Sequence, residues 1–128
     1  MSENITRQEL EAILPKALAF WQKVLRLQDW RITTEIGRGY DMGDNSGLCT
    51  DAVALKTSLI RLMVPEDYHP KWVGEEDWEE TLVHELIEVH FAPFKTNKKG
   101  PMNIFQEQAI ECLATAFVKL RRDGGIEF

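Results

Sequence analysis

The chain has 128 residues, of which 44% are hydrophobic and 28% are charged, as expected for one globular domain. This composition excludes disordered and fibrous proteins. A total of 15 lysine and arginine residues against 21 aspartate and glutamate residues gives a net charge of −6, which argues against nucleic acid or anionic membranes as partners.

The two cysteines, Cys49 and Cys112, lie in no Cys-x-x-Cys pair, so we expect two reduced thiols, with Cys112 in the core. The N-terminal residues are polar and predict no secretory signal. Every stretch rich in apolar residues also contains charges, so no transmembrane helix is predicted. We therefore expect a soluble cytoplasmic protein, and the sequence does not specify its oligomeric state.

The chain begins with a predicted helix over residues 7–27. Thr6 and Glu9 have the spacing of a capping box, in which each side chain binds the backbone N–H of the other residue. Apolar residues then recur at helical spacing. Pro15 lacks a backbone N–H, so we expect it to kink this helix or to restart it.

Three short strands are predicted next, because apolar residues recur there at the spacing of a strand. They span residues 30–36, 48–55 and 58–64. Residues 37–47, between the first two strands, include four glycines and predict a loop or a wide turn.

Two helices complete the chain. The first spans about residues 75–91 and begins with a cluster of acidic residues, which suits a helix N-terminus. Residues 92–102 form a predicted loop with a small basic cluster, and the second helix spans about residues 104–122. Strands and helices are segregated along the chain, so we predict an α+β fold in which residues 1–128 form one domain, with helices on one face of a small sheet.

The first of these two helices contains charged residues where its pattern requires burial. Residues 81–91, TLVHELIEVHF, are apolar on almost every side of the helix. His84, Glu85, Glu88 and His90 nevertheless lie among them. Buried carboxylates are unfavourable unless they are paired or bind a metal ion, so this conflict indicates a functional site.

Helical geometry groups three of these side chains. Positions four apart differ by about 40° in azimuth, so His84 and Glu88 project from one face, with Glu85 beside them. His-Glu-x-x-His binds zinc in metallopeptidases through this geometry, and here Glu88 occupies the second ligand position. His90 lies about 240° around the helix and joins the others only if the helix unwinds near Pro93. The simpler interpretation of His84 is a core histidine that is hydrogen-bonded to a carboxylate.

The last helix supplies further candidate ligands. Glu107 and Glu111 are four residues apart in a run that is otherwise largely apolar. Two carboxylates on one face of a buried helix require a cation or a partner that shares a proton. We therefore expect the two helices to pack side by side, with His84 close to both carboxylates. The simpler interpretation places Glu107 and Glu111 on a polar surface.

Together the two motifs resemble those of the gluzincins, the zinc peptidases of thermolysin type. In that family His-Glu-x-x-His is followed by a glutamate ligand on the next helix, often within Glu-x-x-x-Asp. Here His84-Glu85-x-x-Glu88 precedes Glu107-Gln-Ala-Ile-Glu111, with glutamate in place of the second histidine and of the aspartate. The layout more closely resembles small metallopeptidases encoded by phages and prophages, which implies a zincin-like fold and, for a phage protein, the host cytoplasm.

The resemblance implies a hydrolase that cleaves peptide bonds in a peptide or protein substrate with the help of one zinc ion. The implied zinc ligands are His84, Glu88 and Glu107. Glu85 would act as the general base on a metal-bound water, and Glu111 would orient His84. The alternative function is a non-catalytic protein-binding module on the same scaffold, which the glutamate at position 88 favours.

Two further assignments stay open in the sequence. A second ligand set combines His84 and His90 with Glu107 or Glu111, because zinc favours nitrogen ligands. Tyr68 and His69 precede the motif helix and are candidates for stabilising an oxyanion, as such residues do in related peptidases. The simpler interpretation, which we favour for Tyr68 and His69, is an ordinary loop.

Overall fold

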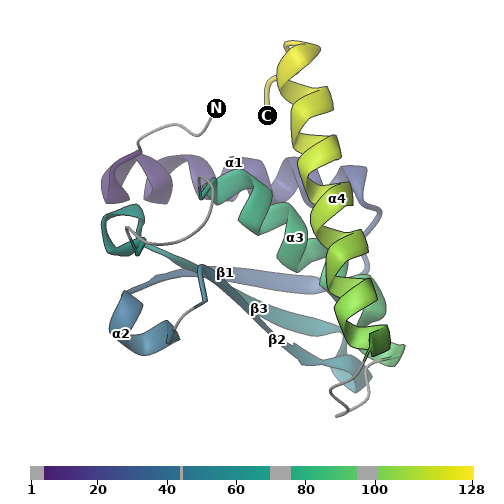
Figure 1. The fold of residues 1–128 in the computed structure, drawn as a ribbon. Coiled ribbons are helices and arrows are strands. Elements are labelled where there is room, and N and C mark those ends of the chain that lie inside the picture. The colour runs from purple at the N-terminus through teal and green to yellow at the C-terminus, as the bar shows by residue number, and fades with distance from the viewer. Residues whose placement is uncertain (1–4, 44, 70–75, 95–100) are drawn as a thin grey trace.

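A helix, a three-stranded sheet and two further helices follow one another along the chain (Figure 1). The structure, a computed structural model, describes residues 5–43, 45–69, 76–94 and 101–128. In chain order its main elements are α1 (Arg7–Val24), β1 (Arg31–Gly37), α2 (Gly39–Met42), β2 (Gly47–Ala52), β3 (Thr57–Met63), α3 (Trp78–Phe91) and α4 (Pro101–Asp123). Short 3-10 turns are η1 (Val53–Leu55), η2 (Pro65–Asp67) and η3 (Ala92–Phe94). The predicted α+β class is confirmed.

The sheet is mixed, with β3 at its centre. β1 pairs with β3 in parallel, and β2 pairs with β3 in antiparallel orientation. Ile32 lies opposite Ser58, and Cys49 lies opposite Ile60, so these side chains share one face of the sheet. Strand β2 ends earlier than the predicted second strand, because the chain turns into η1 after Ala52.

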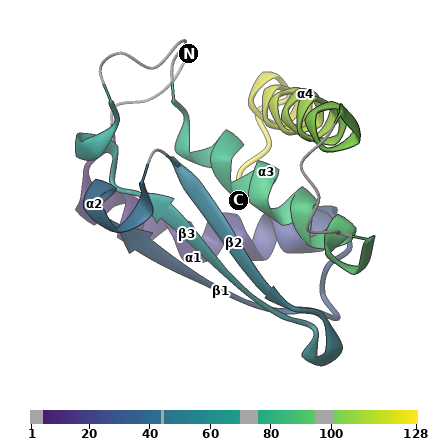
Figure 2. The ribbon, with the colours of Figure 1, turned by 60° about the horizontal axis from the view of Figure 1, so that its bottom comes forward.

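Helices α1 and α3 cover one face of the sheet, and α4 packs outside them against α3 (Figures 1 and 2). The core between the layers contains Trp21 of α1, Leu82 and Leu86 of α3, and Ile60 and Leu62 of β3, all nearly or completely buried. The helices therefore gather on one side of the sheet, as the sequence predicts.

Helix α1 begins with the predicted capping box. Thr6 Oγ1 accepts a hydrogen bond from the Glu9 N–H at 3.1 Å, and the Glu9 carboxylate accepts one from the Thr6 N–H at 3.2 Å. The helix continues through Pro15 to Val24, so the predicted restart at the proline does not occur. It ends earlier than predicted because Arg26 adopts the left-handed conformation, with φ of 59°.

The bounds of the last two helices also differ from the prediction. Helix α3 begins at Trp78 because Asp77 is its N-cap, and the Asp77 carboxylate accepts hydrogen bonds from the N–H groups of Glu79 and Glu80. The predicted start at residue 75 and the basic cluster before α4 lie outside the described residues. Helix α4 begins earlier than predicted, at Pro101, because proline is tolerated in the first turn of a helix.

The apolar sequence of α4 predicts a helix that is buried on most of its sides. In the structure most of its surface is exposed instead. Between residues 103 and 123, where burial is described, its fully buried residues form one stripe, Ile110, Ala114 and Val118. Cys112 is exposed, so its predicted place in the core is wrong. The physical reason is that α4 packs chiefly against one neighbour, α3, and leaves its opposite side open.

A network of charges joins the start of α3 to the end of α4. Glu79 is completely buried, and its carboxylate accepts hydrogen bonds from Trp21 Nε1 at 2.8 Å and from Arg121 Nε at 2.6 Å. Arg122 binds Asp77 through two hydrogen bonds of 2.7 and 3.0 Å. These contacts hold the two helices antiparallel and fix the register in which their other side chains meet.

Candidate metal centre

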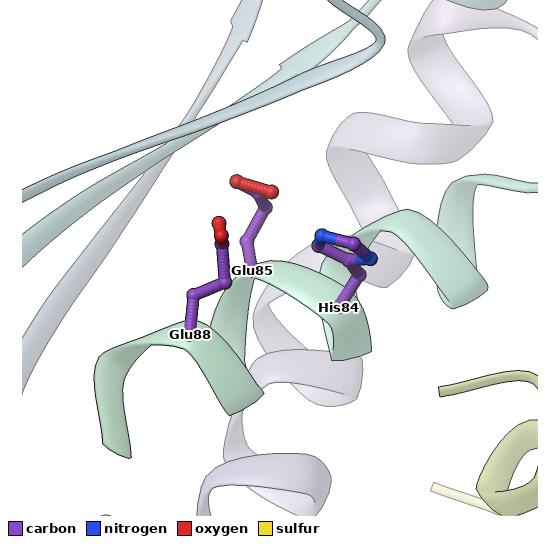
Figure 3. Close-up of side chains that lie close together, drawn as sticks. All are labelled: His84, Glu85 and Glu88. Atoms are coloured by element: carbon purple, nitrogen blue, oxygen red, sulfur yellow. The ribbon is translucent and has the colours of Figure 1, made fainter. Parts of the chain in front are cut away.

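Helix α3 presents three potential metal ligands on one side. One ligand atom from each of His84, Glu85 and Glu88 lies within 4.8 Å of the others (Figure 3). Apolar residues on the remaining sides of α3 are buried against the sheet, α1 and α4, which fixes the rotation of the helix. The rotation that buries this apolar surface therefore brings the three polar side chains together.

His84 is held between two carboxylates of α4. Its Nδ1 lies 2.7 Å from Oε2 of Glu111, and its Nε2 lies 3.1 Å from Oε2 of Glu107. The His84 side chain is 17% exposed, whereas the side chains of Glu107 and Glu111 are 44% and 63% exposed. The predicted packing of α3 beside α4, with His84 close to both carboxylates, is confirmed.

This arrangement of His84 has a chemical consequence. A neutral imidazole offers one N–H donor and one bare nitrogen, and an ionised carboxylate only accepts hydrogen bonds. Neutral His84 therefore donates to only one of Glu107 and Glu111. The second contact becomes favourable when the ring is doubly protonated or when a cation binds at one nitrogen.

Glu85 is almost buried, with 5% of its surface exposed. Its side chain lies against the first residue of β2: a Cβ on Gly47 would be 3.2 Å from Cγ of Glu85 and 2.5 Å from Cγ2 of Thr81. Only glycine permits this close approach of strand and helix. Gly47 is therefore a site residue that the sequence analysis missed, since it was counted there only as part of a loop.

A cleft of about 330 Å³ opens beside His84 and Glu85. Its lining residues in the described part of the chain are Asn45, Ser46, Gly47, Glu76, Thr81, His84, Glu85 and Glu111. Carboxylates and one imidazole supply all the titratable groups among them. The cleft therefore suits a cation and opens beside His84, Glu85 and Glu111, whereas Glu88 and Glu107 are not among its lining residues.

A second polar group lies on the helix-covered face of the sheet. The Cys49 thiol donates to Asp51 Oδ1 at 3.0 Å, and the Ser58 hydroxyl donates to the same oxygen at 2.8 Å. Burial of Cys49, and then the neighbouring Asp51 carboxylate, raise the pKa of the thiol above its ordinary value, and Glu85 adds to the shift. The thiol is therefore neutral near pH 7. The alternation of Cys49 and Asp51 along one strand was the only sequence signal for this group.

The structure places His90 outside this site. Its Nε2 lies 2.7 Å from the backbone carbonyl oxygen of Leu25, just beyond the end of α1, and donates a hydrogen bond to it. Helix α3 runs without a break to Phe91, so the unwinding that would redirect His90 does not occur before that residue. The second ligand set of the sequence analysis is therefore not brought together.

Tyr68 and His69 are not among the described residues that line the cleft. Tyr68 is half-buried, and burial, together with the charges of Glu76 and Asp77, raises the pKa of its phenol above the ordinary value. His69 is exposed. Their predicted role at an oxyanion stays a prediction.

A comparison with known proteins found no matching family model, no similar curated protein and no similar solved structure. Among the residues that the structure describes, none of the helices combines the length and the apolar character needed to cross a membrane.

Proposed function

We propose that the chain is a zinc-dependent metallopeptidase of the gluzincin kind on a zincin-like scaffold. The observation that carries this proposal is the position of His84, which contacts Glu107 and Glu111 of α4 while Glu85 and Glu88 lie beside it on α3. Of the five residues that the resemblance assigns to the site, three form one group on α3, and Glu107 and Glu111 of α4 each contact the His84 ring. All five would contribute to a site with one zinc ion.

The donor atoms fit zinc in type, and one pair of them fits it in spacing. Zinc accepts imidazole nitrogen and carboxylate oxygen, and two donors each about 2.0–2.2 Å from one tetrahedral ion lie about 3.3–3.6 Å apart. The 3.1 Å distance between His84 Nε2 and Glu107 Oε2 is close to this separation. Glu88 would supply the third protein ligand; it belongs with His84 and Glu85 to the group on α3, and because Glu107 is not in that group, a shift of the Glu88 or Glu107 side chain would bring all three ligands to one ion.

The remaining two carboxylates would have separate roles. Glu111 would orient the His84 ring through Nδ1, as hydrogen-bonded carboxylates do for histidine ligands. Glu85, at the wall of the cleft, would take the proton of a water molecule that attacks a peptide carbonyl. A zinc ion bound at the site would supply the Lewis acid that polarises this carbonyl.

The second candidate function is a non-catalytic protein-binding module. Glu88 stands where the peptidases of this kind carry a second histidine, and this substitution is the specific feature that favours the module. In that case the metal ion, or the contacts of His84 with Glu107 and Glu111 alone, would stabilise the fold.

One pair of measurements separates the two functions. We would determine the zinc content of the purified chain by elemental analysis and its hydrolysis of fluorescently labelled casein, for the wild type and Glu85→Gln. Glu80→Gln, on the same helix and not among the residues that line the cleft, is the matched control. The proposal expects about one zinc ion per chain in all three proteins and loss of hydrolysis only in Glu85→Gln.

The other outcomes decide against the peptidase. Bound zinc without hydrolysis in the wild type would favour the binding module. Hydrolysis that survives in Glu85→Gln at the wild-type rate would remove Glu85 from the reaction. Absence of zinc and of hydrolysis would overturn both the metal site and the activity.

A further inference from the structure

The side of α4 that faces away from α3 carries a continuous apolar surface. Phe105, Leu113 and Leu120 are 59%, 44% and 68% exposed. Three smaller residues beside them are also exposed. We name these six residues the outer face of α4: Phe105, Ala109, Cys112, Leu113, Ala116 and Leu120.

The outer face is unusual for a helix at the surface. At about 100° per residue, its six members fall within an arc of about 100°. Between residues 105 and 120 every residue in this arc is apolar. A surface helix normally places polar residues opposite its buried stripe, and here that stripe is Ile110, Ala114 and Val118. Helix α4 is thus apolar on two opposite sides, and in the described part of the chain only the side with Ile110, Ala114 and Val118 is covered.

The six residues are arranged symmetrically along the helix. Phe105 and Leu120, Ala109 and Ala116, and Cys112 and Leu113 all have the same midpoint, between residues 112 and 113. When a second copy is rotated by 180° about an axis through the midpoint, each apolar residue of the outer face therefore lies opposite another apolar residue. This apolar match of the surface with itself favours a second copy of this chain as the occupant.

We infer that the protein forms a two-fold symmetric homodimer in which the α4 helices of two copies pack antiparallel through their outer faces. Phe105 would then pack against Leu120 of the partner subunit, at both ends of the contact. Ala109 and Ala116 lie between these ends, and their small side chains permit the two helices to approach closely.

Charge and area agree with this contact. Lys119 borders the outer face, and Asp123 continues its arc beyond Leu120; these two charges pair with each other at 2.8 Å, and the symmetry places no like charges opposite each other. The exposed area of the six side chains is about 400–500 Å² per copy, so that the dimer would bury about 1,000 Å² in total. This area lies at the lower end for specific interfaces, where weak and transient contacts are found, so we expect a weak dimer with a dissociation constant on the order of micromolar.

The first test measures the mass of the protein by sedimentation velocity between about 1 and 200 μM, a range that brackets such a constant. Ala116→Glu places a charge at the centre of the outer face, and Thr115→Glu places the same charge one residue away, outside the arc. We expect dimers for the wild type and Thr115→Glu, and a dissociation constant raised about tenfold or more in Ala116→Glu. Circular dichroism checks that both variants are folded.

The second test uses the position of Cys112 beside the proposed axis. For antiparallel helices packed about 8–9 Å apart, the two Cys112 Cα atoms would lie about 6 Å apart, within the range of a disulfide. Mild oxidation with copper phenanthroline should therefore produce a covalent dimer in the wild type and none in Cys112→Ser. A wild type that is monomeric at every concentration, or a dimer that Ala116→Glu leaves intact and oxidation does not cross-link, would overturn the inference.

Discussion

Nδ1 of His84 lies 2.7 Å from Oε2 of Glu111, although 27 residues separate the two in the sequence. The contact depends on the antiparallel packing of α3 and α4, which the ion pair of Glu79 with Arg121 fixes at the other end of the helices. The contacts of the His84 ring are therefore a property of the helix pair, whereas the group of His84, Glu85 and Glu88 lies on α3 alone.

Removal of Glu111 should weaken zinc binding without unfolding the protein. The side chain is 63% exposed, so Glu111→Ala leaves no cavity, and the loss of an orienting carboxylate typically lowers metal affinity by about 10–100-fold. Competition with a zinc-binding dye measures the affinity. Thr115→Ala, one turn further along α4, is the control, and equal affinities of the two variants would show that Glu111 does not orient His84.

Substitution of Gly47 should destabilise the fold at the cleft. A Cβ at this position would be 2.5 Å from Cγ2 of Thr81, so we expect Gly47→Ala to lower the free energy of unfolding by about 1–3 kcal/mol. Urea denaturation measures this change. Thr81→Ser removes the opposing methyl group, and the double variant should recover most of the loss. A double variant as unstable as Gly47→Ala would mean that another contact causes the loss.

Glu79 should contribute strongly to stability through its buried ion pairs. Its carboxylate is completely buried against Arg121 and Arg122. Glu79→Gln removes the carboxylate that pairs with Arg121, while Arg122 keeps Asp77, and should cost about 3–5 kcal/mol. Glu80→Gln should change the free energy of unfolding by less than about 0.5 kcal/mol, as a typical surface substitution does. Similar urea midpoints for the two variants would contradict this assignment.

The two cysteines should differ in their reactivity towards a thiol reagent such as Ellman's reagent. Cys112 is exposed, whereas Cys49 is half-buried, and its raised pKa keeps it protonated at pH 8. We therefore expect one fast thiol per chain in Ala116→Glu, in which the proposed dimer contact over Cys112 is weakened, and the further substitution Cys112→Ser should abolish the fast phase. Persistence of that phase in the double variant would contradict the described surroundings of Cys49.

Asp67 should make stability depend on pH in acid. Arg38 Nε, at 2.7 Å, and then the Gly39 N–H hold the pKa of Asp67 below its usual value of 3.8. Because the folded state has the lower pKa, the stabilisation is present above the usual value and disappears as the pH falls through the lowered one. The difference in urea midpoint between the wild type and Asp67→Asn should therefore shrink as the pH falls from 5 to 2. A constant difference would exclude this linkage.

Local signals in the sequence predicted the elements that carry the site. The spacing of His84, Glu85 and Glu88 on one helix, and of Glu107 and Glu111 on the next, was sufficient to predict that the helices pack together. The exposure of Cys112 was not predictable, because an apolar helix does not reveal how many neighbours cover it. The ion pairs of Glu79 were missed for a related reason, since helix-end charges interact favourably with their own helix and need no partner elsewhere.

The pairing of the strands was also beyond the sequence. Alternation identifies a strand but gives neither its neighbour nor its direction, so the parallel pairing of β1 with β3 carried no local signal. The group formed by Cys49, Asp51 and Ser58 depends on the register of β2 with β3 and became visible only with the fold.

The central claim is that His84, Glu88 and Glu107 bind one zinc ion, and zinc stoichiometry tests it most directly. Four proteins would be loaded with zinc, dialysed and measured by elemental analysis: the wild type, His84→Ala, Glu88→Ala and His90→Ala. His90 is the matched control, because it lies on the same helix and binds the Leu25 carbonyl instead of the site. We predict about one zinc ion per chain in the wild type and His90→Ala, and loss of tightly bound zinc in the other two. Full occupancy in Glu88→Ala together with loss in His90→Ala, or a wild type that retains no zinc, would contradict the claim.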